Sequence, residues 1–243
     1  MIYQRELAIV IPCKNEENYI GVLLRSLSRQ TYNMSSAQIV VADAGSTDRT
    51  PGVIRQFQEE HPWMSVEVIQ GGMPSVGRNR GAAHTDSGYI LFVDADVELR
   101  DGDLIRRALF KMRKEKLHCA TTDIKCGSPS LLSATMYGVS NIAQRLSRLS
   151  RPYSTGMFML FERKTFEKLG GFDEAITFAE DYDLSSKVAS NKFRVIPGHI
   201  FTSNRRFQRS GYLKVTKLFL GTAFRAGRRA PFSSDHNYWH GSY

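Results

Sequence analysis

Cysteine is scarce in this sequence, and long apolar runs are absent from it. The three cysteines, Cys13, Cys119 and Cys126, are odd in number and follow no metal-ligand spacing. This pattern predicts reduced thiols in a cytosolic compartment. No apolar stretch approaches the roughly 20 residues that a membrane-spanning helix needs. Residues 1–6 are polar and the apolar run at 7–12 is short, so we expect no signal peptide.

Acidic residues are too few to balance the basic ones. Asp and Glu number 24 against 33 Lys and Arg, which gives a net charge of +9. This excess predicts an anionic partner, for which nucleic acid, a phosphorylated small molecule and an anionic membrane are the candidates. The 243 residues suit one α/β domain, alone or with an appendage. A chain of this length buries roughly 70–75% of its unfolded surface, so it needs no covalent staples.

The stretch at residues 89–96 gives the first indication of a ligand site. The apolar residues 89–93 lead directly into Asp94 and Asp96. The run indicates a strand of a parallel sheet, buried on both faces, and ligands of open α/β sheets bind beyond the carboxyl ends of such strands. Two carboxylates this close repel each other unless a cation bridges them or one is protonated. A divalent ion such as Mg²⁺ or Mn²⁺ is the natural partner, although an ordinary acidic turn is the plainer interpretation.

Further apolar runs alternate with helical patterns. Residues 7–12, 38–43 and 66–69 are predicted strands, and helices are predicted after each of them. This alternation predicts a doubly wound, mostly parallel sheet with helices on both faces. In the second half we expect further strands and helices in this order: a helix at 104–116, a strand at 119–125, a helix at 131–149, a strand at 153–161, helices from 165 and 179, and a strand at 193–200.

Charged residues at two predicted helix starts suggest a site. Arg78 and Arg80 lie near the beginning of the helix at 76–83, where the helix dipole disfavours cations. An anionic ligand would explain them, and a solvated face is the alternative. Glu180 and Asp181 begin a later helix, where the dipole favours acids by about 0.3–1 kcal/mol each without any catalytic role.

Six motifs, in order, resemble one family. The chain resembles the inverting family 2 glycosyltransferases of the GT-A fold over residues 7–207. The motifs that carry the resemblance are Ile11-Pro12-Cys13-Lys14-Asn15-Glu16, Asp43-Ala44-Gly45-Ser46-Thr47-Asp48, Gly77-Arg78-Asn79-Arg80-Gly81, Asp94-Ala95-Asp96, Gly170-Gly171-Phe172-Asp173-Glu174 and Glu180-Asp181. Each motif is weak alone, and the ordered set is specific.

The resemblance implies a role for each matching position. Asp181 would be the catalytic base, with Glu180 beside it, and Asp96 would bind the divalent metal, Mn²⁺ or Mg²⁺, with Asp94. The residues implied to bind the nucleotide sugar are Pro12, Lys14, Asn15, Glu16, Asp43, Gly77, Arg78, Arg80, Asp94, Arg205 and Arg206.

Two departures from the family pattern affect these roles. Ala44 stands where many members have a second acid, which weakens any inference about the nucleotide base. The stretch Asn204-Arg205-Arg206-Phe207 only approximates the Gln-x-x-Arg-Trp motif that binds diphosphate and acceptor in some members.

These expectations give a division of the chain. Residues 1–207 would form the glycosyltransferase domain, with a nucleotide-binding half at 1–100 and an acceptor-binding half at 101–207. Residues 208–243 would be a basic amphipathic extension, with a helix at 212–229 that either docks on the domain or lies on an anionic membrane. The expected partners are a nucleotide-diphosphate sugar and a hydroxyl acceptor, with a lipid-linked acceptor as one option. The expected location is the cytoplasm, with the cytoplasmic face of the membrane as an alternative.

Two other functions remain open. A nucleotidyltransferase would also bind a nucleotide and a metal, but residues 13–18 contain no glycine and so lack its usual phosphate loop. A nucleic-acid-binding protein would explain the positive charge. However, the sequence contains no recognisable nucleic-acid-binding module, and acidic residues occupy the edge of the sheet where a ligand is predicted. We therefore expect no nucleic-acid partner.

Overall fold

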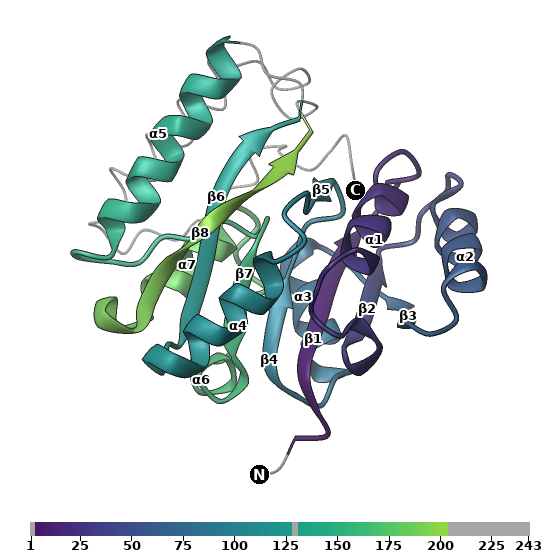
Figure 1. Ribbon diagram of the computed structural model, residues 1–243, viewed down its shortest axis with the longest axis horizontal. Coiled ribbons are helices and arrows are strands. Elements are labelled where there is room, and N and C mark those ends of the chain that lie inside the picture. Colours follow the sequence, from purple (N-terminus) through teal and green to yellow (C-terminus); the bar gives the residue numbers. More distant parts are fainter. Residues whose placement is uncertain (1–2, 128–130, 204–243) are drawn as a thin grey trace.

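The computed structural model of the protein describes residues 3–127 and 131–203 (Figure 1). One sheet of eight strands, in the order β3-β2-β1-β4-β7-β6-β8-β5, runs through it. The strands are β1 (Arg5–Cys13), β2 (Gln38–Asp43), β3 (Ser65–Gln70), β4 (Ser87–Phe92), β5 (Val97–Glu98), β6 (Cys119–Cys126), β7 (Met159–Glu162) and β8 (Phe193–Thr202).

Helices pack on both faces of this sheet (Figure 1). The α-helices are α1 (Ile20–Ser28), α2 (Thr50–Glu60), α3 (Pro74–Ala83), α4 (Leu104–Glu115), α5 (Leu131–Ser147), α6 (Arg163–Lys168) and α7 (Glu180–Ser186). Two short 3₁₀ helices, η1 (Met34–Ser36) and η2 (Ser190–Lys192), complete the described elements. The predicted α/β fold class is therefore confirmed.

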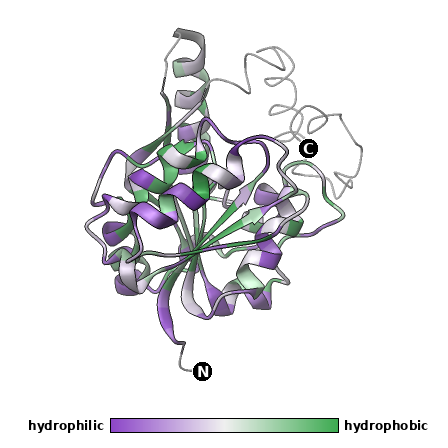
Figure 2. Cartoon of the chain, turned by 90° about the vertical axis from the view of Figure 1, so that its right-hand side faces the viewer, coloured by the Kyte–Doolittle hydropathy of each residue, from purple (hydrophilic) through white to green (hydrophobic). Residues whose placement is uncertain are grey.

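The first half of the sheet is parallel, as the alternating pattern predicts. β1 pairs in parallel with β2 and β4, and β2 pairs in parallel with β3. Cys13 at the end of β1 lies opposite Asp43 at the end of β2. Along β4, Leu91 packs into the apolar cluster on one face of the sheet, and Ile90 and Phe92 pack into the other. Figure 2 shows the resulting hydrophobic strands at the centre of the molecule.

The second half is mixed in direction. β7 is antiparallel to both β4 and β6, and the two-residue β5, which the sequence pattern did not predict, is antiparallel to β8. The predicted strand at 153–161 is wrong in its first part, because only Met159–Glu162 forms a strand. Backbone N–H groups before it bond to side chains of α7 instead of a ladder: Ser154 to Ser185 and Gly156 to Asp181.

A glycine brings α3 close to the sheet. A Cβ atom on Gly81 would lie only 2.3 Å from Cγ1 of Val10 in β1, so no larger residue fits without displacing the helix. Gly77, one turn earlier, would place its Cβ 3.5 Å from Cβ of Ala42 and 3.6 Å from Cβ of Pro12. This close approach places the intervening Arg78 at the edge of the sheet where β1, β2 and β4 end.

Helix α5 covers part of the edge of β6 with side chains. β7 pairs with β6 only at Cys119 and Ala120. Farther along, Asn141 of α5 donates through Nδ2 to the carbonyl oxygen of Ile124 and accepts from its backbone N–H, both at 2.9 Å. The amide of Gln144 adds a bond to the carbonyl oxygen of Thr122. The helix thus supplies hydrogen bonds that a neighbouring strand would otherwise make.

Three further predictions concern the C-terminal extension, membrane-spanning helices and the cysteines. The predicted extension at 208–243 lies outside the described residues. Within 3–127 and 131–203, none of the helices combines the length and the apolar character required to cross a bilayer. The three cysteines, predicted to be reduced, are buried thiols.

Candidate active site

The loops that follow β1 and β2 are joined to each other by hydrogen bonds. The hydroxyl of Ser46 donates to Asp43 at 2.5 Å and accepts from the backbone N–H of Asn15 at 2.8 Å. The side-chain oxygen of Asn15 in turn accepts from the N–H of Thr47. Asn15 has a φ of 54°, a left-handed conformation that asparagine tolerates better than most residues. Two predicted nucleotide-binding residues, Asn15 and Asp43, therefore share one rigid loop pair.

The predicted nucleotide-binding residues at the end of β1 and in the loop after it differ in their exposure to solvent. Pro12 and Glu16 are buried, Lys14 is half-buried and Asn15 is exposed. The backbone N–H of Glu16 donates to Thr50 at the start of α2. The buried Gly77 faces the ends of β1 and β2 from α3. These positions lie around the carboxyl end of the parallel strands, where the sequence predicted a ligand.

Arg78 lies at the centre of a buried charge cluster. Its side chain is 3% exposed. Nη2 donates to Oδ1 of Asp94 at 2.7 Å, and Nη1 donates to Oε1 of Glu180 at 2.6 Å. Burial by itself would lower the pKa of Arg78, but Asp94, Glu180 and Asp181 outweigh it and raise that pKa. Arg78 is thus permanently charged and joins α3, the end of β4 and α7.

The two predicted catalytic carboxylates have different surroundings. Glu180 is buried and holds Arg78, whereas Asp181 is partly buried and accepts through Oδ2 from the backbone N–H of Gly156 at 2.8 Å. Burial, followed by the neighbouring Glu180 charge, raises the pKa of Asp181 to about 6. The positive charge of Arg78 and two backbone N–H donors oppose this rise. A carboxylate with such a pKa can take up and release a proton near neutral pH.

Asp94 and Asp96 are also not equivalent. Asp94 is ion-paired with Arg78, while Oδ2 of Asp96 accepts from the Ser203 hydroxyl at 2.7 Å and from that of Thr202 at 3.4 Å. β5 pairs with β8 through Val97 and Thr202, and this pairing brings Ser203 to Asp96. The sequence pattern missed Ser203, because nothing in it indicated the β5–β8 pairing. Arg205 and Arg206 follow shortly in the chain but lie outside the described residues.

The chemistry of Asp96 is compatible with a divalent metal ion. Among the residues that the structure describes, no group of three or more His, Cys, Asp or Glu side chains is arranged to hold one. Mg²⁺ and Mn²⁺ are commonly bound through one or two carboxylates, with waters and substrate phosphates as the other ligands. Asp96, with Asp94 two residues away, satisfies this smaller requirement.

Asn79 joins α3 to the loop at 170–174, although the sequence pattern indicated no separate role for it. Its amide donates to the carbonyl oxygen of Phe172 at 2.8 Å and to Glu174 at 2.9 Å, and it accepts from the N–H of Phe172 at 2.9 Å. Gly171, at a φ of 70°, leaves room for this side chain. The motifs at 77–81 and 170–174 are thus bound to each other through Asn79. In the sequence, the only indication of this contact was that both motifs are present.

One predicted cation is directed away from the charge cluster. Arg80 is exposed, and its Nη1 donates to the carbonyl oxygen of Gly71 at 2.7 Å. The structure therefore brings together Arg78, Asp94, Glu180 and Asp181, and it connects Asp96 to the end of β8. Arg80 lies on the side of α3 that meets the loop between β3 and α3.

The model of glycosyl transferase family 2 matches residues 8–170. The chain belongs to this family. It is 33% identical to glycosyltransferase GlyA of Streptococcus pneumoniae over 97 residues, which cover 40% of the chain and 14% of that protein. It is 26% identical to the succinoglycan biosynthesis protein ExoA of Rhizobium meliloti, over 77% of the chain and 59% of ExoA. A third relative is beta-monoglucosyldiacylglycerol synthase of Synechocystis, at 23% identity over 78% of the chain and 41% of that enzyme.

Solved structures share the architecture of this family 2 chain. One is mannosyltransferase PcManGT from Pyrobaculum calidifontis, in complex with GDP-Man and Mn²⁺. Its match to this chain has a TM-score of 0.67 at 20% sequence identity, and the aligned part covers 90% of this chain and 65% of the PcManGT chain. Staphylococcus aureus TarS 1–349, in complex with UDP, has a TM-score of 0.63 at 17% identity, with 82% and 60% covered. At these identities the likeness shows the fold, which is GT-A. The chain spans less than two thirds of each of the three curated relatives, from 14% of GlyA to 59% of ExoA.

Proposed function

We propose that the protein is an inverting glycosyltransferase that moves a sugar from a nucleotide-diphosphate donor to an acceptor hydroxyl. The observation that carries the proposal is the network in which Arg78 joins Asp94 to Glu180, next to the carboxylate of Asp181. The nucleotide sugar GDP-Man in the related PcManGT structure supports the donor class.

In this proposal, Asp181 is the general base. The acceptor hydroxyl oxygen forms a bond to the anomeric carbon, the bond from that carbon to the diphosphate breaks, and the hydroxyl proton goes to the Asp181 carboxylate. One displacement without an enzyme nucleophile inverts the anomeric carbon. The N–H of Gly156 fixes Oδ2 of Asp181 at 2.8 Å, and the N–H of Tyr182 fixes Oδ1 at 2.7 Å, which orients the carboxylate for this task.

The leaving diphosphate would be bound at the end of β4. Asp96 and Asp94 would hold the divalent ion, which when bound would stabilise negative charge on the departing diphosphate. Mn²⁺ in the PcManGT complex supports this choice of ion. Arg205 and Arg206 follow Ser203 in the sequence, and Ser203 contacts Asp96, so these two cations are our candidates for the diphosphate. We assign Arg78 a positioning role through Asp94 and Glu180.

The donor and acceptor would bind to different halves. Residues 1–100, with Asn15 and Asp43, would bind the nucleotide, and residues 101–207, with Asp181, would bind the acceptor. The acceptor is proposed to be a lipid-linked or cell-envelope hydroxyl. The names of the diacylglycerol-glycolipid synthase and succinoglycan relatives support this class.

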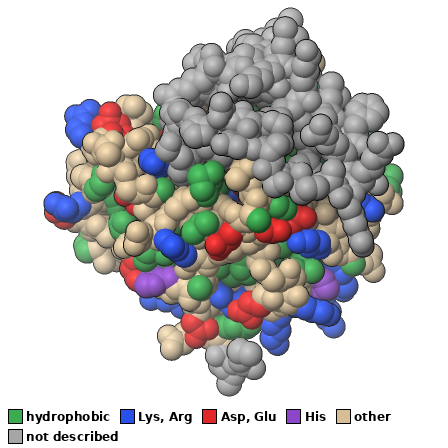
Figure 3. Space-filling view, turned by 180° about the vertical axis from the view of Figure 1, so that it is seen from behind, with side chains coloured by type: hydrophobic (Ala, Val, Ile, Leu, Met, Phe, Trp, Pro, Cys, Tyr) green, Lys and Arg blue, Asp and Glu red, His purple; other side chains and the backbone are tan. Residues whose placement is uncertain are grey.

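A nucleic-acid-binding function is less well supported. Residues 204–243 contain eight Lys and Arg and one Asp, so this segment accounts for seven of the nine net positive charges. On the face in Figure 3, the acidic and basic side chains of the described residues are interspersed. A basic binding surface for a polyanion would instead gather charge of one sign.

A screen of nucleotide sugars tests the proposal. UDP- and GDP-sugars would be added with and without Mn²⁺, and unfolding would be followed by thermal shift. A donor at 100 times its dissociation constant should add about 2.7 kcal/mol of stability. The stabilising donor should then release its sugar, slowly to water and faster to an acceptor. Release of pyrophosphate from nucleoside triphosphates, without sugar release, would favour a nucleotidyltransferase and refute the proposal.

A further inference from the structure

Helix α5 carries its aliphatic residues on the outside. Val139, Ile142, Leu146 and, just past the helix end, Leu149 are 62%, 59%, 58% and 79% exposed. Their spacing of three, four and three residues places them in one stripe along the helix. We call these four residues the α5 stripe. By the helical rise it extends over about 15 Å.

The opposite face of α5 packs on the sheet with both apolar and polar side chains: Tyr137 is buried in the apolar core and Met136 packs against that core. Ser133 and Gln144 are fully buried, and Asn141 pairs with the backbone of Ile124. Arg145 reaches Asp123 at 2.6 Å. The described part of the domain thus contacts α5 through this mixed inward face, whereas the α5 stripe is exposed and is not accounted for by that packing.

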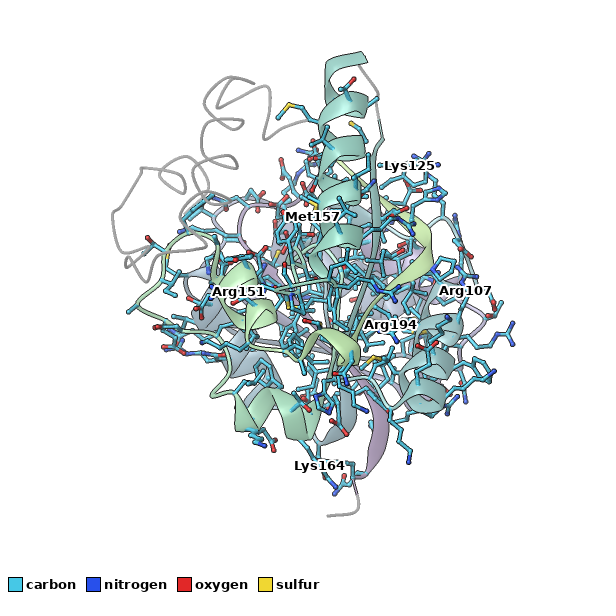
Figure 4. The ribbon with its side chains drawn as sticks, turned by 90° about the vertical axis from the view of Figure 1, so that its left-hand side faces the viewer. Arg107, Lys125, Arg151, Met157, Lys164 and Arg194 are labelled. Atoms are coloured by element: carbon cyan, nitrogen blue, oxygen red, sulfur yellow. The ribbon has the colours of Figure 1, made fainter. Side chains whose placement is uncertain are left out.

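The charged residues within α5 and its flanking segments are all basic. No Asp or Glu occurs between Asp123 and Glu162, while the same stretch contains Lys125, Arg145, Arg148 and Arg151. Arg148 and Arg151 are exposed at the carboxyl end of the helix. In Figure 1 and Figure 4, α5 rises beyond the body of the sheet, so its outer side is presented away from the domain.

From this arrangement we propose that the α5 stripe inserts into the surface of an anionic lipid bilayer, with the flanking Arg148 and Arg151 at the level of the lipid head groups. An apolar helix face flanked by cations is the pattern that binds such interfaces, and each basic residue near an anionic leaflet adds to the attraction.

The charge next to the α5 stripe favours a bilayer over two other binding partners, namely residues 204–243 of the same chain and a second copy of the chain. Residues 204–243 carry a net charge of +7, so they would meet like charge at Arg148 and Arg151. A second copy of the chain would bring the same arginines into the contact. An anionic bilayer matches both the apolar and the cationic parts of the surface.

This surface goes beyond the proposed transfer reaction, and its test needs no sugar donor. The full chain would be floated with phosphatidylcholine vesicles that contain increasing phosphatidylglycerol. The double variant Ile142→Gln, Leu146→Gln removes the middle of the stripe. The matched control is Phe110→Gln, since Phe110 in α4 is a similarly exposed apolar residue at 54%. We expect binding only to anionic vesicles, weakened roughly tenfold or more in the double variant and unchanged in the control.

A direct probe locates the contact. Because all three native cysteines are buried, a Leu149→Cys variant can be labelled selectively with an environment-sensitive fluorophore. Anionic vesicles should increase its fluorescence, and a label at Phe110→Cys should not respond. Unchanged vesicle binding by the double variant would overturn the proposal and point to residues 204–243. Failure of the wild-type chain to bind anionic vesicles, or a dimer that the double variant converts to a monomer, would overturn it as well.

Discussion

Arg78 and Glu180, 102 residues apart in the chain, are joined by a buried ion pair of 2.6 Å. The same guanidinium binds Asp94, so one cation serves two carboxylates from different halves of the molecule. Gly156 lies against this guanidinium: a Cβ atom there would be 2.2 Å from Nη2 of Arg78. The contact explains why glycine occupies position 156, whose N–H also holds Asp181.

The first prediction concerns Arg78. Arg78→Met would leave the carboxylates of Asp94 and Glu180 without their cation in a buried environment, and we expect a loss of about 3–5 kcal/mol in unfolding free energy. Arg78→Lys keeps the charge but cannot form both bonds with the same geometry, so its loss should be smaller. Arg80→Met, two residues away and exposed, is the control and should cost about 1 kcal/mol or less. Urea unfolding measures all three, and equal losses for the Arg78→Met and Arg80→Met variants would contradict the central role of Arg78.

The second prediction is the pH dependence of Asp181. With a pKa of about 6, Asp181 is a base only when deprotonated, so the transfer rate should rise as pH increases through 6. Asp181→Asn should retain nucleotide binding and lose about 10²–10⁴-fold in transfer, along with this limb of the profile. An Asp181→Asn variant with normal transfer would show that another group is the base.

A third prediction follows from the same residue and needs no substrate. The folded-state pKa of Asp181, about 6, lies above the unfolded value of about 4. Between these values the native state binds a proton that the unfolded state has released, so the unfolding free energy should fall as pH rises through this window. The Asp181→Asn variant has no carboxyl group at this position and so lacks this pH-dependent contribution to the unfolding free energy. Its stability relative to wild type should therefore increase from about pH 4 to about pH 6 and then level off. Parallel stability curves for the two proteins would refute the shifted pKa.

The fourth prediction separates Asp94 from Asp96. Asp94→Asn removes a charge from the buried Arg78 cluster and should cost about 1–3 kcal/mol of stability. Asp96→Asn changes a partly exposed side chain that accepts from Ser203, and its stability should change by about 0.5 kcal/mol or less. Only the Asp96→Asn protein should combine near-native stability with loss of Mn²⁺-dependent protection by nucleotide. Thermal shift with and without Mn²⁺ distinguishes the two, and full protection in Asp96→Asn would remove this residue from the metal site.

The fifth prediction concerns Asn79. Asn79→Ala removes three hydrogen bonds to Phe172 and Glu174 and should reduce stability by about 2 kcal/mol. Asn79→Asp keeps the acceptor for the N–H of Phe172 but turns a second carboxylate oxygen toward the Phe172 carbonyl and Glu174, so we expect a loss at least as large as that of Asn79→Ala. Denaturant titration provides the measurement. No change in Asn79→Ala would mean that the 170–174 loop is held by other contacts.

The local pattern predicted the strands around the site well. β2 forms at Gln38–Asp43 as expected, and the apolar run before Asp94 forms β4. These successes share a cause: a buried parallel strand needs an unbroken apolar run, and the chain shows each one directly. The carboxyl edge of the sheet, with Asp43 and Asp94, could therefore be located from the sequence.

The pairings between distant residues could not be predicted in this way. The sequence indicated Arg78 and Glu180 as charged residues at helix starts, but their contact depends on how α7 packs against α3. The bond between Ser203 and Asp96 likewise requires the short β5, which has too few residues for a recognisable pattern. The error at 153–158 has the same origin, because side chains of α7 take the backbone N–H groups that a strand would use.

The bonds between Asn141 and Ile124 have a consequence for protein engineering. An obvious way to improve the behaviour of the purified protein would be to delete α5 and its exposed aliphatic residues. That deletion would uncover the backbone of β6 beyond Ala120, which α5 now caps through Asn141 and Gln144. An uncovered strand edge is a template for pairing with other chains and for aggregation. Point substitutions on the outer face of α5 are therefore the safer route to a well-behaved protein.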